Sequence, residues 1–303
     1  MQTRLTKLLN IKYPIIQGGM AAITDAVLAS AVSNAGGAGI IGAGGHNAIW
    51  VKEQVRKARK LTDKSFGVNI VLAAEDKDEI IDVVCEEKPV FVTFGAGNPI
   101  PYIDRLKKLG IITIPVVANL KQALKVEKAG ADAMVTEGME AGGHIGRHTI
   151  MALLTNIVPN VNIPVIAAGG IADSRGLKAA LAMGAEGVQI GSAFLISEEC
   201  PAHINVKHRI IEATDMDSVV LGHTIGHDAR GIRNKFTDEY LALEYSDAPR
   251  EALTGKMKGV YNKAFVDGDV DNGYIEVGQS LNALNEILSC KQIIQALIKG
   301  LVF

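Results

Sequence analysis

The chain has 303 residues, of which 48% are hydrophobic and 32 are glycine, and its 31 basic residues nearly balance its 33 acidic ones. This length suits one large α/β domain, or one domain that carries an inserted segment. The balanced charge argues against a polyanion as the partner of the whole molecule. With only 5% aromatic residues, a stacking surface for nucleic acid is also not expected.

The sequence shows no pattern typical of a signal peptide, a membrane span or a disulfide framework. Residues 1–14 contain no long apolar run, and the glycine-rich stretch 27–45 is interrupted by polar residues, so we expect neither a signal peptide nor a membrane span. Cys85, Cys200 and Cys290 are far apart and form no CxxC pair. A disulfide framework or zinc site is therefore not expected, and a reducing cytoplasm is the predicted location.

Short runs rich in β-branched residues recur along the first two-thirds of the chain, separated by amphipathic helical patterns. The runs are 13–16, 38–42, 66–71, 90–95, 111–117, 133–138, 164–170 and 187–194. Their nearly continuous hydrophobicity is typical of strands that are covered on both faces. Glycine recurs where helix gives way to strand, as in KLGIITIP and KAGADAMV. The pattern predicts a (β/α)8 barrel, and a doubly wound sheet is the alternative, although no GxGxxG follows the first strand.

About a third of the chain follows the eighth predicted strand. Residues 200–274 read as charged, less regular helices, and the chain from Gly278 onward reads as strongly helical. We therefore predict a barrel over 1–199, a helical lid over 200–274, and C-terminal helices over 275–303 that return to the barrel as its last helix. A separate C-terminal helical domain is the alternative.

The ends of five predicted strands carry glycine or small polar residues. They are QGGM (17–20), Asn69, EGMEAGGHIG (137–146), AAGGIADS (167–174) and QIGSAF (189–194). Glycine allows close backbone approach to a ligand, and in barrels the reacting groups lie at these ends. The loops after strands seven and eight commonly hold a phosphate, so a phosphate-bearing ligand is predicted at Gly169, Gly170, Gly191 and Ser192. Asp173 and Ser174 are expected to cap the next helix.

Six motifs in this order resemble one enzyme family. IIQGGM, GVNI, EGMEAGGHIG, PVIAAGGIAD, QIGSAF and GDVDNGYIEVGQ are similar to the flavin-dependent enoyl-acyl carrier protein reductase II, of the nitronate monooxygenase-like (2-nitropropane dioxygenase-like) family. The resemblance implies a (β/α)8 barrel that binds FMN under a helical segment. The implied flavin contacts are Gly18, Gly19, Met20, Asn69, Glu137, Gly142, Gly169, Gly170, Gln189, Ile190, Gly191 and Ser192. The family's QxGT appears here with Ser192, which keeps a hydroxyl donor.

The resemblance also gives EGMEAGGHIG a place beside the flavin. Glu137 would accept from a flavin N–H or a ribityl hydroxyl, although a salt-bridged rim carboxylate is the alternative. His144 matches the family's active-site histidine, and an imidazole holds or gives a proton near neutral pH. Its predicted role is to stabilise charge on the thioester oxygen or to move the proton for the α-carbon. Glu140 is expected to be structural, and His148 to lie outside the chemistry.

Two further histidines raise the question of a metal. His223 and His227 are four residues apart, but no carboxylate stands at zincin spacing, so no metal site is expected. They are predicted to be lid residues near the mouth. Arg230, Arg233 and Lys235 offer a basic patch for an acidic carrier protein if that segment is helical, whereas a solvated helix is the alternative.

The implied reaction is reduction of a trans-2-enoyl thioester on acyl carrier protein, in fatty acid biosynthesis. FMN would be the cofactor and NADH or NADPH the co-substrate. A homodimer is expected, and the resemblance implies activation by a monovalent cation, although the sequence shows no coordinating set. Rival interpretations are a nitronate monooxygenase that uses FMN and O2, a flavin-free lyase or isomerase with a phosphate site, and a noncatalytic flavin binder.

Overall fold

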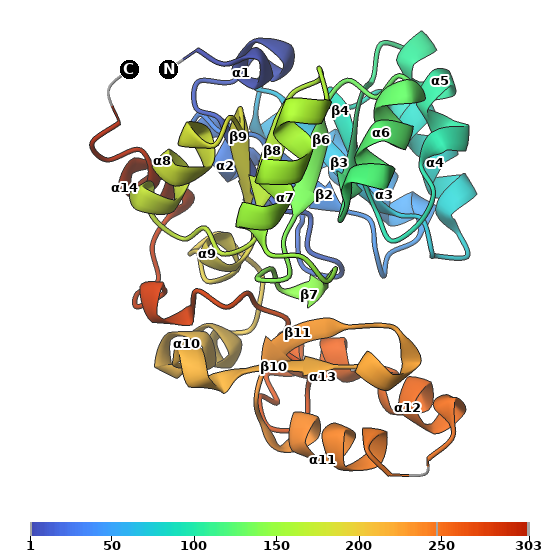
Figure 1. Cartoon of the computed structure of the whole chain (residues 1–303), viewed down its shortest axis with the longest axis vertical. Coiled ribbons are helices and arrows are strands. Elements are labelled where there is room, and N and C mark those ends of the chain that lie inside the picture. Colours follow the sequence, from blue (N-terminus) through green and yellow to red (C-terminus); the bar gives the residue numbers. More distant parts are fainter. Residues whose placement is uncertain (1, 247, 302–303) are drawn as a thin grey trace.

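Eight parallel strands form the centre of the molecule. The computed structural model describes residues 2–246 and 248–301 (Figure 1). The strands are β1 (Ile15–Gln17), β2 (Gly39–Gly42), β3 (Phe66–Val71), β4 (Phe91–Gly95), β5 (Ile112–Val117), β6 (Met134–Glu137), β8 (Val165–Ala168) and β9 (Gly187–Ile190). They pair in the order β1-β9-β8-β6-β5-β4-β3-β2, and a parallel bridge from Ile16 to Ala38 closes β1 onto β2. The predicted (β/α)8 barrel is confirmed, and the doubly wound alternative is wrong.

Helices cover the outside of the barrel. They are α2 (Ala26–Asn34), α3 (Ala48–Leu61), α4 (Lys77–Glu87), α5 (Ile100–Lys108), α6 (Leu120–Lys128), α7 (Ile150–Ile157), α8 (Ser174–Ala182) and the short α9 (Ser192–Leu195). Several begin at a side-chain cap. The Asp173 carboxylate accepts from the first-turn N–H groups of Arg175 and Gly176, so the predicted cap of α8 is confirmed.

The interior of the barrel is sealed at its amino-terminal end by α1 (Arg4–Leu9). Leu5 and Leu9 are fully buried and join a cluster with inward-facing strand residues such as Ile40 and Phe91. This plug leaves the carboxyl ends of the strands as the open end of the barrel, where ligands of such barrels bind. All three cysteines are buried and free, as expected of small hydrophobic residues.

The lid, which we define as residues 200–274, lies below the barrel in Figure 1. It contains α11 (Lys235–Glu244), α12 (Arg250–Lys256) and α13 (Val260–Phe265) around a small apolar core. It also contains α10 (Ile204–Glu212), whose buried Val206 and Ile210 belong to the large cluster of the barrel. Besides the expected helices, the lid contains an element that was not predicted, because β10 (Ser218–Leu221) and β11 (Ala229–Ile232) form an antiparallel hairpin. β-branched residues in SVVL and left-handed backbone at Gly222 and Gly226 favour the hairpin over a helix.

The hairpin also overturns the predicted carrier-docking patch. Arg230 lies in β11 and is 4% exposed, and its guanidinium donates to the carbonyl of Met139 (3.0 Å) and the hydroxyl of Ser218 (2.6 Å). Arg233 is exposed but pairs with Asp238 at 2.8 Å. The two arginines do not share a helical face, so this segment offers no patch of free cations.

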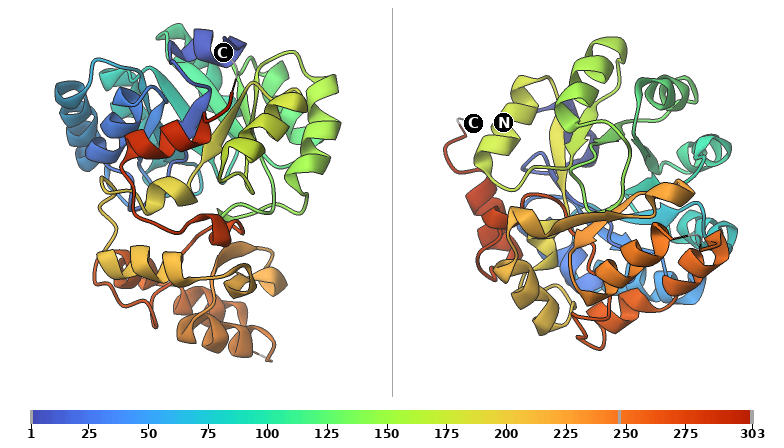
Figure 2. Two further views of the ribbon diagram at one scale, coloured as in Figure 1. Left: turned by 90° about the vertical axis from the view of Figure 1, so that its left-hand side faces the viewer. Right: turned by 60° about the horizontal axis from the view of Figure 1, so that its bottom comes forward.

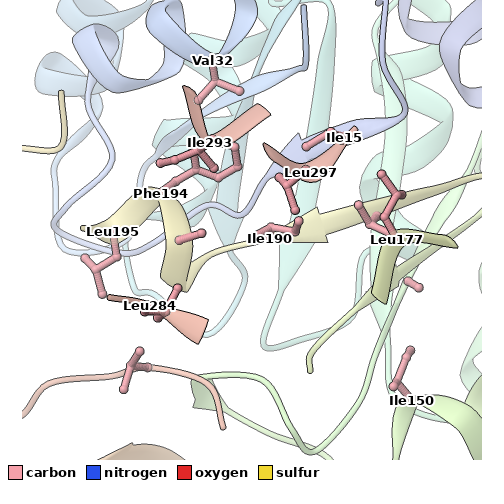
Figure 3. Packing of buried hydrophobic residues seen from close by; sticks show 14 of the residues in the cluster. Ile15, Val32, Ile150, Leu177, Ile190, Phe194, Leu195, Leu284, Ile293 and Leu297 are labelled. Atoms are coloured by element: carbon pink, nitrogen blue, oxygen red, sulfur yellow. The ribbon is translucent and has the colours of Figure 1, made fainter. Parts of the chain in front are cut away.

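The C-terminal segment returns to the barrel, as the left view of Figure 2 shows in red. Its regular helix, α14 (Cys290–Leu297), is shorter than the predicted one because a capping box at Ser289 starts it late. Ile293 and Leu297 pack in the cluster that holds Val32 of α2 and Leu177 of α8 (Figure 3). Residues 278–289 instead follow an irregular path beside the barrel mouth. In the part of the chain that the structure describes, no helix is long and apolar enough to cross a membrane.

The α1 plug can be tested by mutation. Leu9→Ala is expected to lower the free energy of unfolding by about 2–5 kcal/mol, because it removes a fully buried side chain and leaves a cavity. Denaturant unfolding measures the change. Leu61→Ala is the control, because Leu61 is 46% exposed, and it should change stability by less than about 1 kcal/mol. Equal effects of the two substitutions would show that α1 does not seal the barrel.

Candidate active site

The ends of β1 and β9 meet at the mouth. The Gly18 N–H donates to the Ile190 carbonyl at 2.9 Å, and a Cβ at Gly18 would lie 3.6 Å from Cγ of Gln189. A Cβ at Gly191 would have only the Met20 sulfur within 4 Å, at 3.9 Å. The structure therefore brings together the predicted ligand residues that follow β1 and β9, and it leaves open space next to Gly191.

Asn69 joins this group from β3. Its side chain is buried and donates to the Thr93 hydroxyl at 2.9 Å, which fixes the amide. Gly19 packs directly on Asn69, so that any side chain at Gly19 would overlap it. The second glycine of QGGM is thus needed for packing against Asn69, independently of any ligand.

Two consecutive glycines form a turn after β8. Gly169 and Gly170 have φ values of +95° and +72°, which favour glycine. Among the described residues, their backbone N–H groups donate to no protein acceptor, and neither does the N–H of Gly191. Unpaired N–H groups in a tight turn suit an anion such as a phosphate. The Ser192 hydroxyl accepts from the Gly278 N–H at 3.0 Å and keeps its own hydrogen for a ligand.

The loop from Gly138 to Gly146 crosses the mouth and carries His144. Gly142 packs so closely on the backbone of Val277 that a Cβ there would overlap it. Gly143 and His144 form β7, which pairs with β11 of the lid, and the neighbouring Ile145 N–H donates to the Asp228 carbonyl at 2.9 Å. His144 is therefore held by backbone hydrogen bonds from the lid.

The His144 ring lies edge-on to the ring of His227, with centroids 6.5 Å apart. His144 is an exposed residue, but the protein groups around its ring partly desolvate it. This desolvation lowers the pKa of His144, because it disfavours the charged form. At neutral pH the imidazole is therefore neutral, with one nitrogen to donate and one to accept.

Two carboxyl groups at the mouth have raised pKa values, chiefly because burial removes them from solvent. Burial, and then the charge of Glu276, raises the pKa of Glu137 to about 7. Burial likewise raises the pKa of Glu276 to about 7, although a hydrogen bond from the Tyr261 hydroxyl at 2.6 Å opposes the shift. Glu276 also lies against Gly143, where a Cβ would approach its Oε2 to 3.1 Å. Both groups thus titrate near neutral pH.

Sequence reasoning assigned no role to Glu276, to Tyr261 or to the hairpin contact of His144. The available signal was the carboxylate in YIEV, which apolar residues flank within GDVDNGYIEVGQ. The structure also gives the surroundings of the other residues for which the sequence suggested a role. Glu140 accepts from the Ile150 N–H at 3.0 Å and is structural, His148 is exposed, and His223 pairs with Asp228 at 2.9 Å. Across the described residues, no group of three or more potential ligands is placed to hold a metal ion.

Comparison with known proteins decides the family. The profile described as nitronate monooxygenase matches residues 2–83 and 73–300. A probable nitronate monooxygenase of Staphylococcus aureus is 35% identical over 92% of each chain. The chain belongs to the nitronate monooxygenase family.

Solved structures place the chain within this family more finely. FabK from Thermotoga maritima superposes with a TM-score of 0.96 and 45% identity, covering 99% of this chain and 96% of that one. A nitroalkane oxidase from Streptomyces ansochromogenes gives 0.88 and 27%, over 98% and 97%. An enoyl reductase domain from Bacillus amyloliquefaciens gives 0.74 at 15% identity, over 98% and 91%, and shares the fold. This family member is thus similar to FabK over both barrel and lid.

The carboxyl pair predicts a pH-dependent stability of the flavin-free protein. The folded pKa values of about 7 exceed the ordinary 4.5, so the folded state holds extra protons between these values. Stability should fall as pH rises from about 4.5 to 7, since the unfolded state ionises first. Glu276→Gln keeps an acceptor for Tyr261 but removes one charge. The variant should therefore gain melting temperature over the wild type from pH 5 to pH 8.

Thermal unfolding across this range measures the difference. Glu53→Gln, at an exposed position, is the matched control and should follow the wild type at every pH. Parallel curves for the wild type and Glu276→Gln would contradict a coupled carboxyl pair at the mouth.

Proposed function

We propose that this family member is an FMN-dependent enoyl-acyl carrier protein reductase, which reduces trans-2-enoyl thioesters with NADH or NADPH in fatty acid biosynthesis. The likeness to FabK carries the proposal, because FabK is the enoyl-acyl carrier protein reductase II that the sequence motifs resemble. That likeness covers 99% of the chain and so includes the lid. Substrate choice depends on the loops and lid around a barrel mouth rather than on the barrel itself.

The residues at the mouth fit FMN. The unpaired N–H groups of Gly169, Gly170 and Gly191 and the Ser192 hydroxyl would hold its phosphate, and Gly18, Met20 and Asn69 would line the ring and ribityl chain. Met20, Gln189 and Gly191 already enclose one side of this space. Bound FMN supplies a two-electron carrier that relays hydride from the nicotinamide to the β-carbon of the enoyl thioester.

His144 would act on the thioester. Its neutral imidazole has an N–H that can donate to the thioester oxygen as negative charge develops there, or serve the proton transfer to the α-carbon. The pairing of β7 with β11 fixes the backbone of His144, and the ring of His227 lies edge-on beside its imidazole. Such positioning keeps the donor aimed at one point.

Glu137 would face the flavin from the end of β6. When ionised, its carboxylate accepts a hydrogen bond from a ring N–H or a ribityl hydroxyl. The sequence alternative was a salt-bridged rim carboxylate, and no salt bridge to Glu137 is formed among the described residues. Monovalent-cation activation, a homodimeric state and a cytoplasmic location stay predictions.

A nitronate monooxygenase is the second candidate, because the curated relatives at 35% identity carry that name. Anaerobic turnover of NADH or NADPH with a crotonyl thioester supports the reductase. Oxygen-dependent turnover of a nitronate, without thioester reduction, would instead establish the monooxygenase and overturn the proposal.

Flavin binding is tested at Gly191. Gly191→Val should fold, because its φ of −102° suits any residue and the nearest neighbour would be 3.9 Å from the new Cβ. The added side chain should nevertheless fill the flavin space and abolish FMN retention, measured by absorbance of the purified protein and by FMN titration. Gly255→Val, also with open space around it, is the control and should stay yellow. Full flavin retention in Gly191→Val would refute the assignment.

His144→Ala should keep FMN and its reduction by NAD(P)H but lose about 10²–10⁴-fold in thioester reduction, as expected for an acid–base or oxyanion group. Stopped-flow measurement of the two half-reactions separates these effects. His148→Ala, an exposed histidine of the same loop, is the control and should leave both half-reactions intact. A loss under tenfold in thioester reduction would contradict the role of His144.

A further inference from the structure

The outer face of α6 carries a set of free cations. Lys121, Lys125 and Lys128 are exposed on this helix, and no carboxylate within the described chain forms a salt bridge with them. Many other surface cations of the molecule are paired, such as Lys107 with Asp132 at 2.9 Å. The three lysines therefore project uncompensated positive charge although the formal net charge is −2.

Carboxylates near this face are engaged elsewhere. Glu127 of α6 accepts from the backbone N–H groups of residues 162–163, and Asp132 accepts from Thr113 and pairs with Lys107. The following segment, residues 141–172, contains no Asp or Glu at all and adds an exposed Arg147. Hence α6 and the neighbouring α7 together present a surface with no free acid.

An apolar centre lies among these cations. Leu124 is 44% exposed, and with Leu120 and the three lysines it lines a shallow hollow of about 410 Å³. Met151 on the adjacent α7 is 58% exposed. An apolar centre with a charged rim is the arrangement of a protein docking surface.

The position of α6 links this surface to the mouth (Figure 1). The helix begins at Leu120, three residues after β5 ends at Val117, so its first turn stands at the rim. Gly146, from the loop that carries His144, packs against Ala118 in the turn between them. A protein bound to α6 would thus sit next to the opening over His144.

We infer that the outer face of α6, formed by Leu120, Lys121, Leu124, Lys125 and Lys128 with Arg147 beside it, docks the acidic acyl carrier protein that delivers the thioester. The inference rests on the proposed function. Charge complementarity favours this occupant, because a strongly acidic protein would meet free lysines here. A second copy of this chain has a formal net charge of only −2 and is a weaker electrostatic match. This surface replaces the overturned patch at Arg230 and Arg233.

The test is a double charge reversal, Lys121→Glu with Lys125→Glu. Two substrates are compared, the enoyl thioester on carrier protein and the same enoyl group on pantetheine, which has no charged carrier. The variant should lose roughly tenfold in kcat/KM for the carrier substrate, mainly through KM, and change less than twofold with the pantetheine thioester. As the salt concentration rises, kcat/KM for the carrier-linked thioester should also fall more steeply in the wild type than in the variant.

Lys60→Glu with Lys291→Glu is the matched control, since both lysines are exposed on the distant helices α3 and α14. It should behave as the wild type. Binding of the carrier protein, followed by fluorescence anisotropy, gives a readout independent of turnover and should weaken only in the α6 variant.

Three outcomes would overturn the inference. These are equal losses in the α6 and control variants, equal losses with both substrates, or a changed oligomeric state of the α6 variant in light scattering, which would identify the face as a contact between copies. Failure of the proposed function is distinct. In that case the wild type itself reduces neither thioester.

Discussion

The parallel bridge between Ile16 and Ala38 closes the barrel, and most of the site follows from that closure. In an open sheet, β1 and β2 would stand at opposite edges and their ends would be far apart. Closure places Gly19, which follows β1, directly on Asn69 of β3. Residues that are far apart in the chain, from Gly18 to Glu276, thus surround one opening, and the α1 plug fills the opposite end of the barrel.

Within this frame, the chemistry of the mouth is controlled by removal of water. Desolvation moves His144 and the two carboxyl groups in the same chemical sense, toward their neutral forms. The resulting site has groups that exchange protons near neutral pH yet carry little fixed charge. A neutral lining suits a reaction in which charge develops on a substrate oxygen and must be met by a hydrogen-bond donor.

The barrel could be predicted from sequence because buried parallel strands leave a distinctive pattern. Seven of the eight predicted runs contain the observed strand, and the first run, 13–16, overlaps β1 but ends one residue before it. The twelve predicted ligand residues lie at or beside the carboxyl ends of the strands or in the loops that follow them. These positions depend on local periodicity and on the strand order that closure requires. The tight turn at Gly169 and Gly170 could be predicted because a pair of glycines is typical of backbone with positive φ, which the structure has at both residues.

The lid was less predictable for a physical reason. Its hairpin strands, SVVL and ARGI, are short, and the second edge of β11 pairs with β7, which lies far earlier in the chain. Arg230 looked like a surface cation because its acceptors, the Met139 carbonyl and the Ser218 hydroxyl, leave no local signal. Glu276 escaped notice for the same reason, since its neighbours Tyr261 and Gly143 come from separate segments.

The sharing of β7 between the barrel and the lid has a mechanical consequence. As the third strand of the lid's sheet, β7 binds the histidine to whatever motion the lid makes, unless two backbone pairs break first. Displacement of β11 away from the barrel would therefore carry His144 with it. The position of this side chain at the mouth and the position of the lid are thus mechanically coupled through one strand.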